Sequence, residues 1–218
     1  MTKRIFFWLL WLGLTAYAFL LAPPDHPDTL TLIQNLSTGH WDEINPLVIA
    51  LFNIMGVLPM LYACLLLIDG QGQKIRAFPF VIGSFLVGAF ALLPYLALRR
   101  PNPGFKGEKT KLLQLVDSRW TGRAIALTAL VLLTYGITQG DWPDFVQQWQ
   151  TSRFIHVMSL DFCLLCLLIP ALLGDDMERR SLKDNGLFWA IALTPLLGAV
   201  TYLSIRPNLQ AVNLPEGN

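Results

Sequence analysis

The chain has 218 residues, of which 54% are hydrophobic and only 14% are charged, against roughly a quarter charged in an average soluble domain. The charges are segregated and long stretches carry none, which is typical of a polytopic membrane protein and not of one large soluble core. A formal net charge of +1 without a concentrated basic face argues against nucleic acid as a partner, and three cysteines within apolar runs imply no disulfide framework.

Six apolar runs follow one another along the chain, and most reach the roughly 20 residues that cross a bilayer as a helix. No run alternates with the two-residue period of a barrel strand, and a backbone in lipid must satisfy its own hydrogen bonds, so we expect helices. The predicted fold is all-α: a polytopic bundle of about six membrane helices in a single membrane domain, residues 1–218. The runs lie at 5–22, 46–68, 78–98, 124–140, 154–174 and 187–205.

The first run begins after the basic segment "MTKR", and "AYA" at 16–18 resembles a signal-peptidase site. Because "FLLA" continues the apolar stretch beyond that site, we expect an uncleaved anchor helix over 1–22. The loop at 23–45 has four side chains able to ligate a metal, but their spacing fits no standard site, so we expect a polar loop without metal. They are His26, Asp28, His40 and Glu43.

The distribution of lysine and arginine bears on whether the run 78–98 crosses, because in short loops these residues collect on the cytoplasmic side. With six crossings and the N-terminus inside, the inside segments carry fewer of them than the outside segments. If 78–98 were a broken or re-entrant helix, nearly all would lie inside. Because hydropathy is the stronger signal, we expect 78–98 to span, with the re-entrant form as the alternative. Residues that suit a break in this run are Pro79, Gly83, Gly88 and Pro94.

Two parts of the chain echo each other. "MGVLPMLYACLLLIDGQGQK", with a following run that ends in "YLALRRP", parallels "MSLDFCLLCLLIPALLGDDMER", with a run that ends in "YLSIRP". The echo suggests two three-helix halves, which an odd number of crossings per half would make inverted, as in many transporters.

The stretch "EKTKLLQLVDSRW" predicts an amphipathic helix over 109–120, with apolar residues on one face and basic residues around them. Such a helix suits an anionic membrane surface or a protein partner. The residues that we expect to form this surface are Lys109, Lys111, Arg119 and Trp120.

The run 154–174 contains Asp161, which on a helix lies about 10–12 Å below the membrane interface. An ionised carboxylate there costs about 2.5–3.5 kcal/mol, so it should face the bundle interior and find a partner on another helix. Two roles stay open: a proton carrier, which makes Asp161 the candidate catalytic residue, or a structural hydrogen bond between helices. The available polar partners are Asn53, Tyr62, Tyr135, Thr194 and Tyr202.

His156 lies near the start of the same run, where an interfacial histidine making a hydrogen bond is common. It is also a weak candidate for binding a pigment or a metal. It lies about 140° around the helix from Asp161, so the two form no same-face pair. Cys163 and Cys166 are interpreted as small apolar side chains, since the sequence offers no second cysteine pair for a zinc site.

Three strings carry a resemblance over roughly residues 44–206: "NPLVIALFNIMGVLPMLYACLLLIDG", "FPFVIGSFLVGAFALLPYLALR" and "SRFIHVMSLDFCLLCLLIPALLGDD". They resemble a family of cyanobacterial and chloroplast polytopic membrane proteins, which implies a photosynthetic host and a thylakoid or plasma membrane. The C-terminal third is more loosely similar to the plant neoxanthin-synthesis membrane proteins. Seven residues of this chain follow the order found in that family: His156, Asp161, Asp176, Arg179, Pro195, Gly198 and Arg206. The stretch "FCLLCLLIP" replaces the tryptophan- and arginine-rich stretch that the family has after the aspartate.

The chain has no Walker loop, dinucleotide-binding glycine pattern, HExxH or Ser/His/Asp motif. We therefore expect a non-enzymatic membrane protein that assists the assembly or stability of photosynthetic complexes or pigments. Its expected partners are membrane lipids and subunits of those complexes, with chlorophyll or a carotenoid as the candidate cofactor. The alternatives are an enzyme that acts on an isoprenoid such as a carotenoid, and a small proton-coupled transporter.

Overall fold

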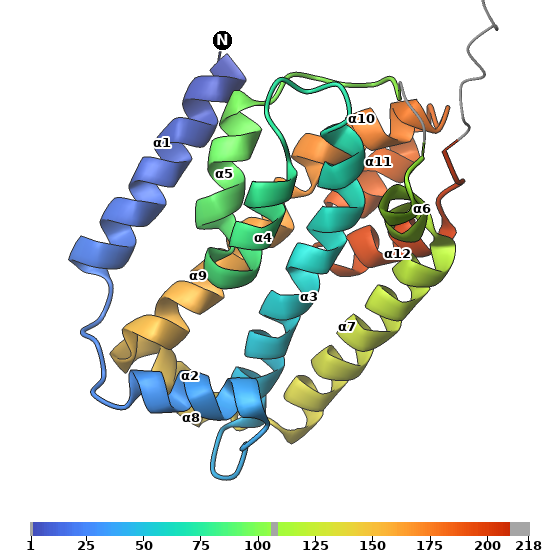
Figure 1. Ribbon diagram of the computed structural model, residues 1–218. Helices are drawn as coiled ribbons and strands as arrows, with labels where there is room; N and C mark the ends of the chain where they lie inside the picture. The colour runs from blue at the N-terminus through green and yellow to red at the C-terminus, as the bar shows by residue number, and fades with distance from the viewer. Residues whose placement is uncertain (1, 106–108, 210–218) are drawn as a thin grey trace, which may run out of the picture.

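The computed structural model describes residues 2–105 and 109–209, which form an all-α bundle (Figure 1). The expected all-helical fold is therefore confirmed. Four helical segments in the described residues are long and apolar enough to cross a membrane: Thr2–Leu21, Pro46–Asp69, Arg119–Gln139 and Arg153–Arg179. The second is α3 and the third is α7. The first joins α1 (Thr2–Ala16) to a π-helical turn (Tyr17–Leu21), and the last joins α9 (Arg153–Leu168) to α10 (Pro170–Arg179).

The run 78–98 does not form one spanning helix, so that prediction is wrong. It forms α4 (Phe78–Val87) and α5 (Ala89–Leu98), which meet at Gly88, where φ is 50° and ψ is −125°. This backbone region favours glycine, and there the chain doubles back (Figure 1). The two ends of the hairpin meet again, because Gln73 Nε2 donates to the Arg100 carbonyl at 2.6 Å and Arg100 N donates to Gln73 Oε1 at 3.0 Å. The segment is a helical hairpin, the broken form that the charge distribution suggested.

The run 187–205 is also broken, which corrects the prediction of a sixth spanning helix. It forms α11 (Asn185–Ala192) and α12 (Leu197–Ile205) around a turn that contains Pro195, which lacks the N–H that a continuous helix needs. Gly198 allows the two short helices to pack closely, since a Cβ there would lie 2.5 Å from the Ile191 carbonyl oxygen. Arg206, just after α12, donates to Asp176 near the end of α10 at 3.0 Å. The second hairpin therefore starts and finishes at the same end of the bundle.

The two halves of the chain share one order of elements. The first half has α1, the short α2, α3 and the α4–α5 hairpin, and the second has α7, the short α8, α9–α10 and the α11–α12 hairpin. Each half contains two long helices and a hairpin that returns, so both halves run in the same direction (Figure 1). The condition for inverted halves, an odd number of crossings in each, is not met, and the two halves run parallel. The short elements are α2 (Thr29–Thr38), α6 (Lys111–Asp117), which joins the halves, and α8 (Trp142–Thr151).

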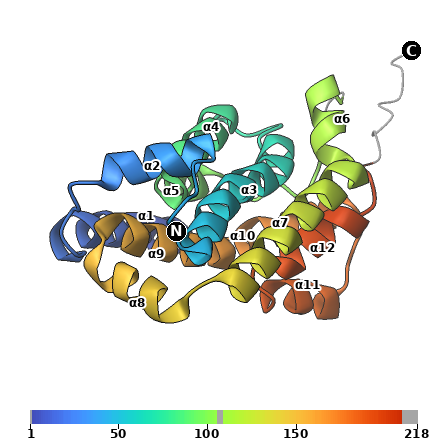
Figure 2. The same cartoon turned by 90° about the horizontal axis from the view of Figure 1, so that it is seen from below.

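The halves interlock through their middle helices. In Figure 2, α9 lies on the side of α1 and α5, whereas α3 runs beside α7. Small residues allow the α3–α7 approach, because a Cβ on Gly136 would lie 2.6 Å from the Ala50 Cβ. The hairpins pack on the first helix of their own half, α5 on α1 and α12 on α7.

The amphipathic helix expected over 109–120 is divided. α6 ends at Asp117, Ser118 caps the next helix by accepting from the Trp120 N–H at 3.2 Å, and α7 begins at Arg119, earlier than the predicted start at 124. Polar and basic residues therefore belong to the first turn of α7. This explains why the fourth apolar run looked short for a membrane helix.

Candidate functional site

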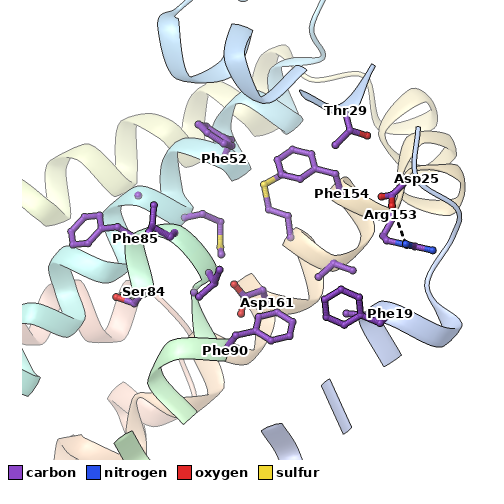
Figure 3. A pocket seen from close by; sticks show the side chains of 18 residues that line it. Phe19, Asp25, Thr29, Phe52, Ser84, Phe85, Phe90, Arg153, Phe154 and Asp161 are labelled. Carbon is purple, nitrogen blue, oxygen red and sulfur yellow. Dashed lines mark hydrogen bonds and ion pairs between the residues drawn. The ribbon is translucent and has the colours of Figure 1, made fainter. Parts of the chain in front are cut away.

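A cavity of about 590 Å³ lies between α3, α9, the turn after α1 and the tip of the α4–α5 hairpin (Figure 3). Ligand pockets in proteins commonly have volumes of about 300–1,000 Å³. On α9, Arg153, Val157 and Asp161 follow one another at four-residue spacing, which puts them on one face, and all three line the cavity. The large apolar side chains of the wall include five phenylalanines and two methionines: Phe19, Phe52, Phe85, Phe90, Phe154, Met55 and Met158.

Asp161 holds the tip of the hairpin from the neighbouring helix. Its Oδ1 accepts a hydrogen bond from the Ala89 N–H, the first residue of α5, at 2.8 Å. Gly88, which precedes α5, has no side chain to cap that helix, so Asp161 does so across the bundle. A carboxylate at a helix N-terminus is also favoured by the helix dipole. Asp161 thus finds its partner in a backbone N–H and not in any of the polar side chains that the sequence offered.

An ion pair marks the outer end of the cavity. Arg153 Nη1 lies 3.0 Å from Asp25 Oδ2, and the side chains are 31% and 66% exposed (Figure 3). Eight residues of helix separate Arg153 from Asp161, a rise of roughly 12 Å. The cavity therefore extends from an exposed ion pair to a carboxyl deep among apolar side chains.

The opposite end of the bundle carries a buried set of ion pairs, here named the charged cluster. Two matching triads form its centre. In the first triad, Asp69 Oδ2 accepts from the Tyr95 hydroxyl at 2.8 Å and from Arg99 Nε at 2.9 Å. In the second, Asp176 Oδ2 accepts from the Tyr202 hydroxyl at 2.7 Å and from Arg206 Nη1 at 3.0 Å. In both, the tyrosine lies 26 residues and the arginine 30 residues after the aspartate. The other members are Lys109, Asp117, Asp175, Arg179 and Arg180.

The triads also join the halves to each other. Arg99 pairs with Asp175 and donates to the Ala171 carbonyl at 3.2 Å, and Arg206 donates to the Cys64 carbonyl at 3.2 Å. Burial alone would lower the pKa of the Arg99 guanidinium, but the hydrogen bonds and ion pairs to Asp69 and Asp175 outweigh burial and hold that pKa above its ordinary value. The contacts of Arg99 and Arg206 thus join elements of one half to elements of the other.

His156 lies in a stack of rings near the end of the bundle opposite the charged cluster. Its ring is 4.3 Å from that of Trp149 and 5.7 Å from that of Tyr17, centroid to centroid. Nδ1 lies 2.8 Å from the Trp149 carbonyl oxygen, which can only accept, and Nε2 lies 2.9 Å from the Tyr17 hydroxyl. Both nitrogens are engaged, so a metal or pigment at Nε2 would have to break the contact with Tyr17.

The remaining sequence candidates lie apart from the cavity. Asn53 donates to the Ile49 carbonyl of its own helix at 2.8 Å. Cys163 is exposed, and Cys166 is buried. In residues 2–105 and 109–209, no group of three or more His, Cys, Asp or Glu side chains is placed to hold a metal ion.

The basic surface predicted over 109–120 is partly turned inward. Lys109 pairs with Asp117 at 2.8 Å, and Arg119 Nε donates to the Arg206 carbonyl at 2.9 Å. Lys111 is exposed, and Trp120 is 74% exposed with the Arg123 guanidinium 4.7 Å from its ring centroid. Arg119 is exposed as well, so Lys111, Arg119, Trp120 and Arg123 are the basic and aromatic residues of this region that lie at the surface.

Sequence reasoning missed the aromatic wall of the cavity and the charged cluster. The phenylalanines and methionines of the wall come from four separate segments, so no local sequence pattern predicts that they line one cavity. The cluster did leave a signal, because the echoed Tyr-Leu and Arg-Pro endings contain the tyrosines and arginines of the two triads.

No family model, no curated protein and no solved structure matches the chain.

Proposed function

We propose that this protein is a multi-pass integral membrane protein that takes a membrane-dissolved small molecule into the cavity beside Asp161. The observation that carries the proposal is a cavity of about 590 Å³ with phenylalanine-rich walls and a carboxyl at its inner end. In lipid, an ionisable side chain at that depth is expensive, and it marks a functional position by default.

The charge distribution supports the multi-pass arrangement and gives it a direction. The segments that carry the described lysines and arginines lie at the end of the bundle that holds the charged cluster (Figure 1), except the start of α9, where Arg153 lines the cavity mouth. The positive-inside rule places that basic end in the cytoplasm, or its equivalent compartment. Four helices then cross, and both hairpins enter from the basic side and return to it.

The shape of the cavity supports a ligand that arrives from the bilayer. Phe19, Phe85 and Leu86 line it and are also 70%, 48% and 83% exposed, so its wall continues into the apolar outer surface of the bundle. In a membrane this surface faces lipid. A molecule dissolved in the bilayer could therefore reach the cavity sideways without crossing water.

A substitution that fills the cavity tests the proposal. Val157→Trp places an indole between the mouth and Asp161, whereas Leu167→Trp adds the same group to a side chain of the same helical segment that is 66% exposed. We expect small molecules extracted from the purified wild-type protein and identified by mass spectrometry to be lost from Val157→Trp and retained by Leu167→Trp. The same molecules in all three samples would refute the proposal.

An enzyme acting on an isoprenoid is the second candidate, because Asp161 Oδ2 accepts no hydrogen bond from the described residues and is available to move a proton. The same extraction separates the two candidates. An enzyme yields a precursor that accumulates when Asp161 is changed to Asn, and a binding protein does not. The assembly role in a photosynthetic membrane, with chlorophyll or carotenoid, stays a prediction from the resemblance.

A further inference from the structure

We propose that the ligand of this cavity is a lipophilic organic cation, which Asp161 binds as a carboxylate in exchange for the proton that otherwise neutralises it. This inference rests on the ligand-binding function proposed above and names its chemical class. Two observations support it: the balance of charge along the cavity and the chemistry of the side chains in its wall.

The cavity has one uncompensated acidic group. Of the charged residues that line it, Asp25 and Arg153 pair with each other at the mouth, which leaves Asp161 without a cationic partner. Oδ1 of Asp161 is engaged by the Ala89 N–H, whereas Oδ2 accepts no hydrogen bond from the described residues. Figure 3 shows this carboxyl among the lining side chains, beside Phe90.

The other elements around Asp161 supply no counter-charge. From α3, the nearest ionisable group is Tyr62, whose hydroxyl donates to the Leu165 carbonyl at 2.5 Å. The lining residues of α4, α5 and the turn after α1 are all uncharged. A positive charge that neutralises the carboxylate must therefore come from the ligand, or a proton must take its place.

The wall suits an organic cation. Five phenylalanines line the cavity, and an aromatic ring presents a negative face that attracts a cation held over it, more strongly where water is excluded. The methionines Met55 and Met158 add flexible, polarisable contacts for an irregular apolar body. A neutral apolar molecule would also gain from these contacts, but it would leave the carboxylate unpaired.

The end of the molecule around the mouth is also acidic. Its described residues carry several carboxylates and Arg153 as the basic side chain, and a surface of one sign concentrates ions of the opposite sign near it. The potential thus favours cations at the outer end and again at the inner end of the same cavity. The carboxylates are Asp25, Asp28, Asp42, Glu43, Asp141 and Asp144.

Two probes of the same shape and opposite charge test the inference: tetraphenylphosphonium and tetraphenylborate, titrated calorimetrically into the purified protein in detergent. We expect the phosphonium to bind and the borate not to bind. Asp161→Asn should weaken phosphonium binding at least about tenfold, as expected when one partner of a buried charge pair is removed. Glu178→Gln is the matched control, because its side chain is exposed at the opposite end of the bundle and does not line the cavity.

The pH dependence provides a test in the wild-type protein, which holds even if Asp161→Asn folds poorly. Since proton and cation compete for one carboxylate, phosphonium affinity should fall as the pH falls through the titration of Asp161, and binding should release a proton to the buffer. Borate binding equal to phosphonium binding, or phosphonium binding that neither acid nor Asp161→Asn weakens, would overturn the inference. The inference could be overturned in this way while a neutral molecule is still extracted from the wild-type protein and lost from Val157→Trp. The proposed function would then stand, and only the cationic class of the ligand would fail.

Discussion

At the scale of single residues, Gly88 and Asp161 form one feature. The positive φ of Gly88 turns α4 into α5, and the missing side chain gives room for the carboxyl that caps α5. A Cβ at Gly88 would lie 1.7 Å from Asp161 Oδ2, closer than any two such atoms can approach. The hairpin tip and the inner end of the cavity therefore depend on the same two residues.

Gly88→Ala should destabilise the protein by about 2–4 kcal/mol, because it strains the backbone and displaces the Asp161 cap together. Gly13→Ala is the matched control, since nothing lies within 4 Å of a Cβ at that helical position and alanine is the better helix former. Thermal unfolding in detergent, followed by circular dichroism, measures both. Equal stability of the two variants would show that the tip does not need glycine.

At the scale of elements, the charged cluster fixes where the hairpins end. Asp176 receives hydrogen bonds from Arg180, Arg206 and Tyr202, which belong to or follow α10 and α12. Removing one charge from such a buried set leaves the others unpaired, which costs more than the pair itself contributes. The charged cluster thus holds the α11–α12 hairpin against α10, and we expect the hairpin to detach when these contacts are lost.

Asp176→Asn should therefore cost about 3–5 kcal/mol, whereas Glu178→Gln, two residues on and exposed, should cost less than about 0.5 kcal/mol. The double variant Asp176→Leu with Arg206→Leu should be more stable than Asp176→Leu alone, because the single variant leaves the buried Arg206 charge without its carboxylate. Arg180 keeps its ion pair with Asp117 in both variants. Unfolding curves of the set give these differences. A double variant that is no better than the single one would contradict the assignment of a buried pair.

The elements also show what the sequence could predict and what it could not. Membrane-length helices were predictable at 46–68 and 154–174 because an unbroken apolar run of that length has one stable state in lipid. The hairpins at 78–98 and 187–205 were not, because their composition equals that of a spanning helix. The charge distribution favoured a break at 78–98, but hydropathy did not, and the conformation at Gly88 and the contacts of Arg99 and Arg206 decide between them.

The candidate site was predictable to the same limited degree. Asp161 stood out in the sequence as a carboxyl within an apolar run. Its partner is a backbone N–H exposed by the break at Gly88, a group that no side-chain pattern reveals. The lining phenylalanines lie in runs where any apolar residue would fit, so their convergence requires the tertiary structure.

At the scale of the whole molecule, the two hairpins explain how the basic residues are distributed between the two ends of the bundle. A count with six crossings leaves the basic residues on both sides, whereas the two hairpins place the described lysines and arginines other than Arg153 at one end. The resulting bundle is basic at one end and acidic at the other.

Cysteine labelling of intact vesicles checks this arrangement, in a background without the native cysteines. Gln71→Cys, Arg100→Cys and Lys183→Cys are at exposed positions at the basic end, and Thr38→Cys is exposed at the opposite end. An impermeant maleimide should label the first three from one side and Thr38→Cys from the other. Labels on opposite sides at Gln71→Cys and Arg100→Cys would restore a spanning helix at 78–98.

The parallel order of the halves has a consequence for how such a chain can arise. A half-length ancestor with two crossings could pair with itself about an axis along the membrane normal and then fuse in tandem, without reinserting the second copy upside down. The shift that carries Asp69 onto Asp176 places Ile54, which is buried, where the first half would match Asp161. The two halves therefore share the charged triads, but at this position only the second half has a carboxyl.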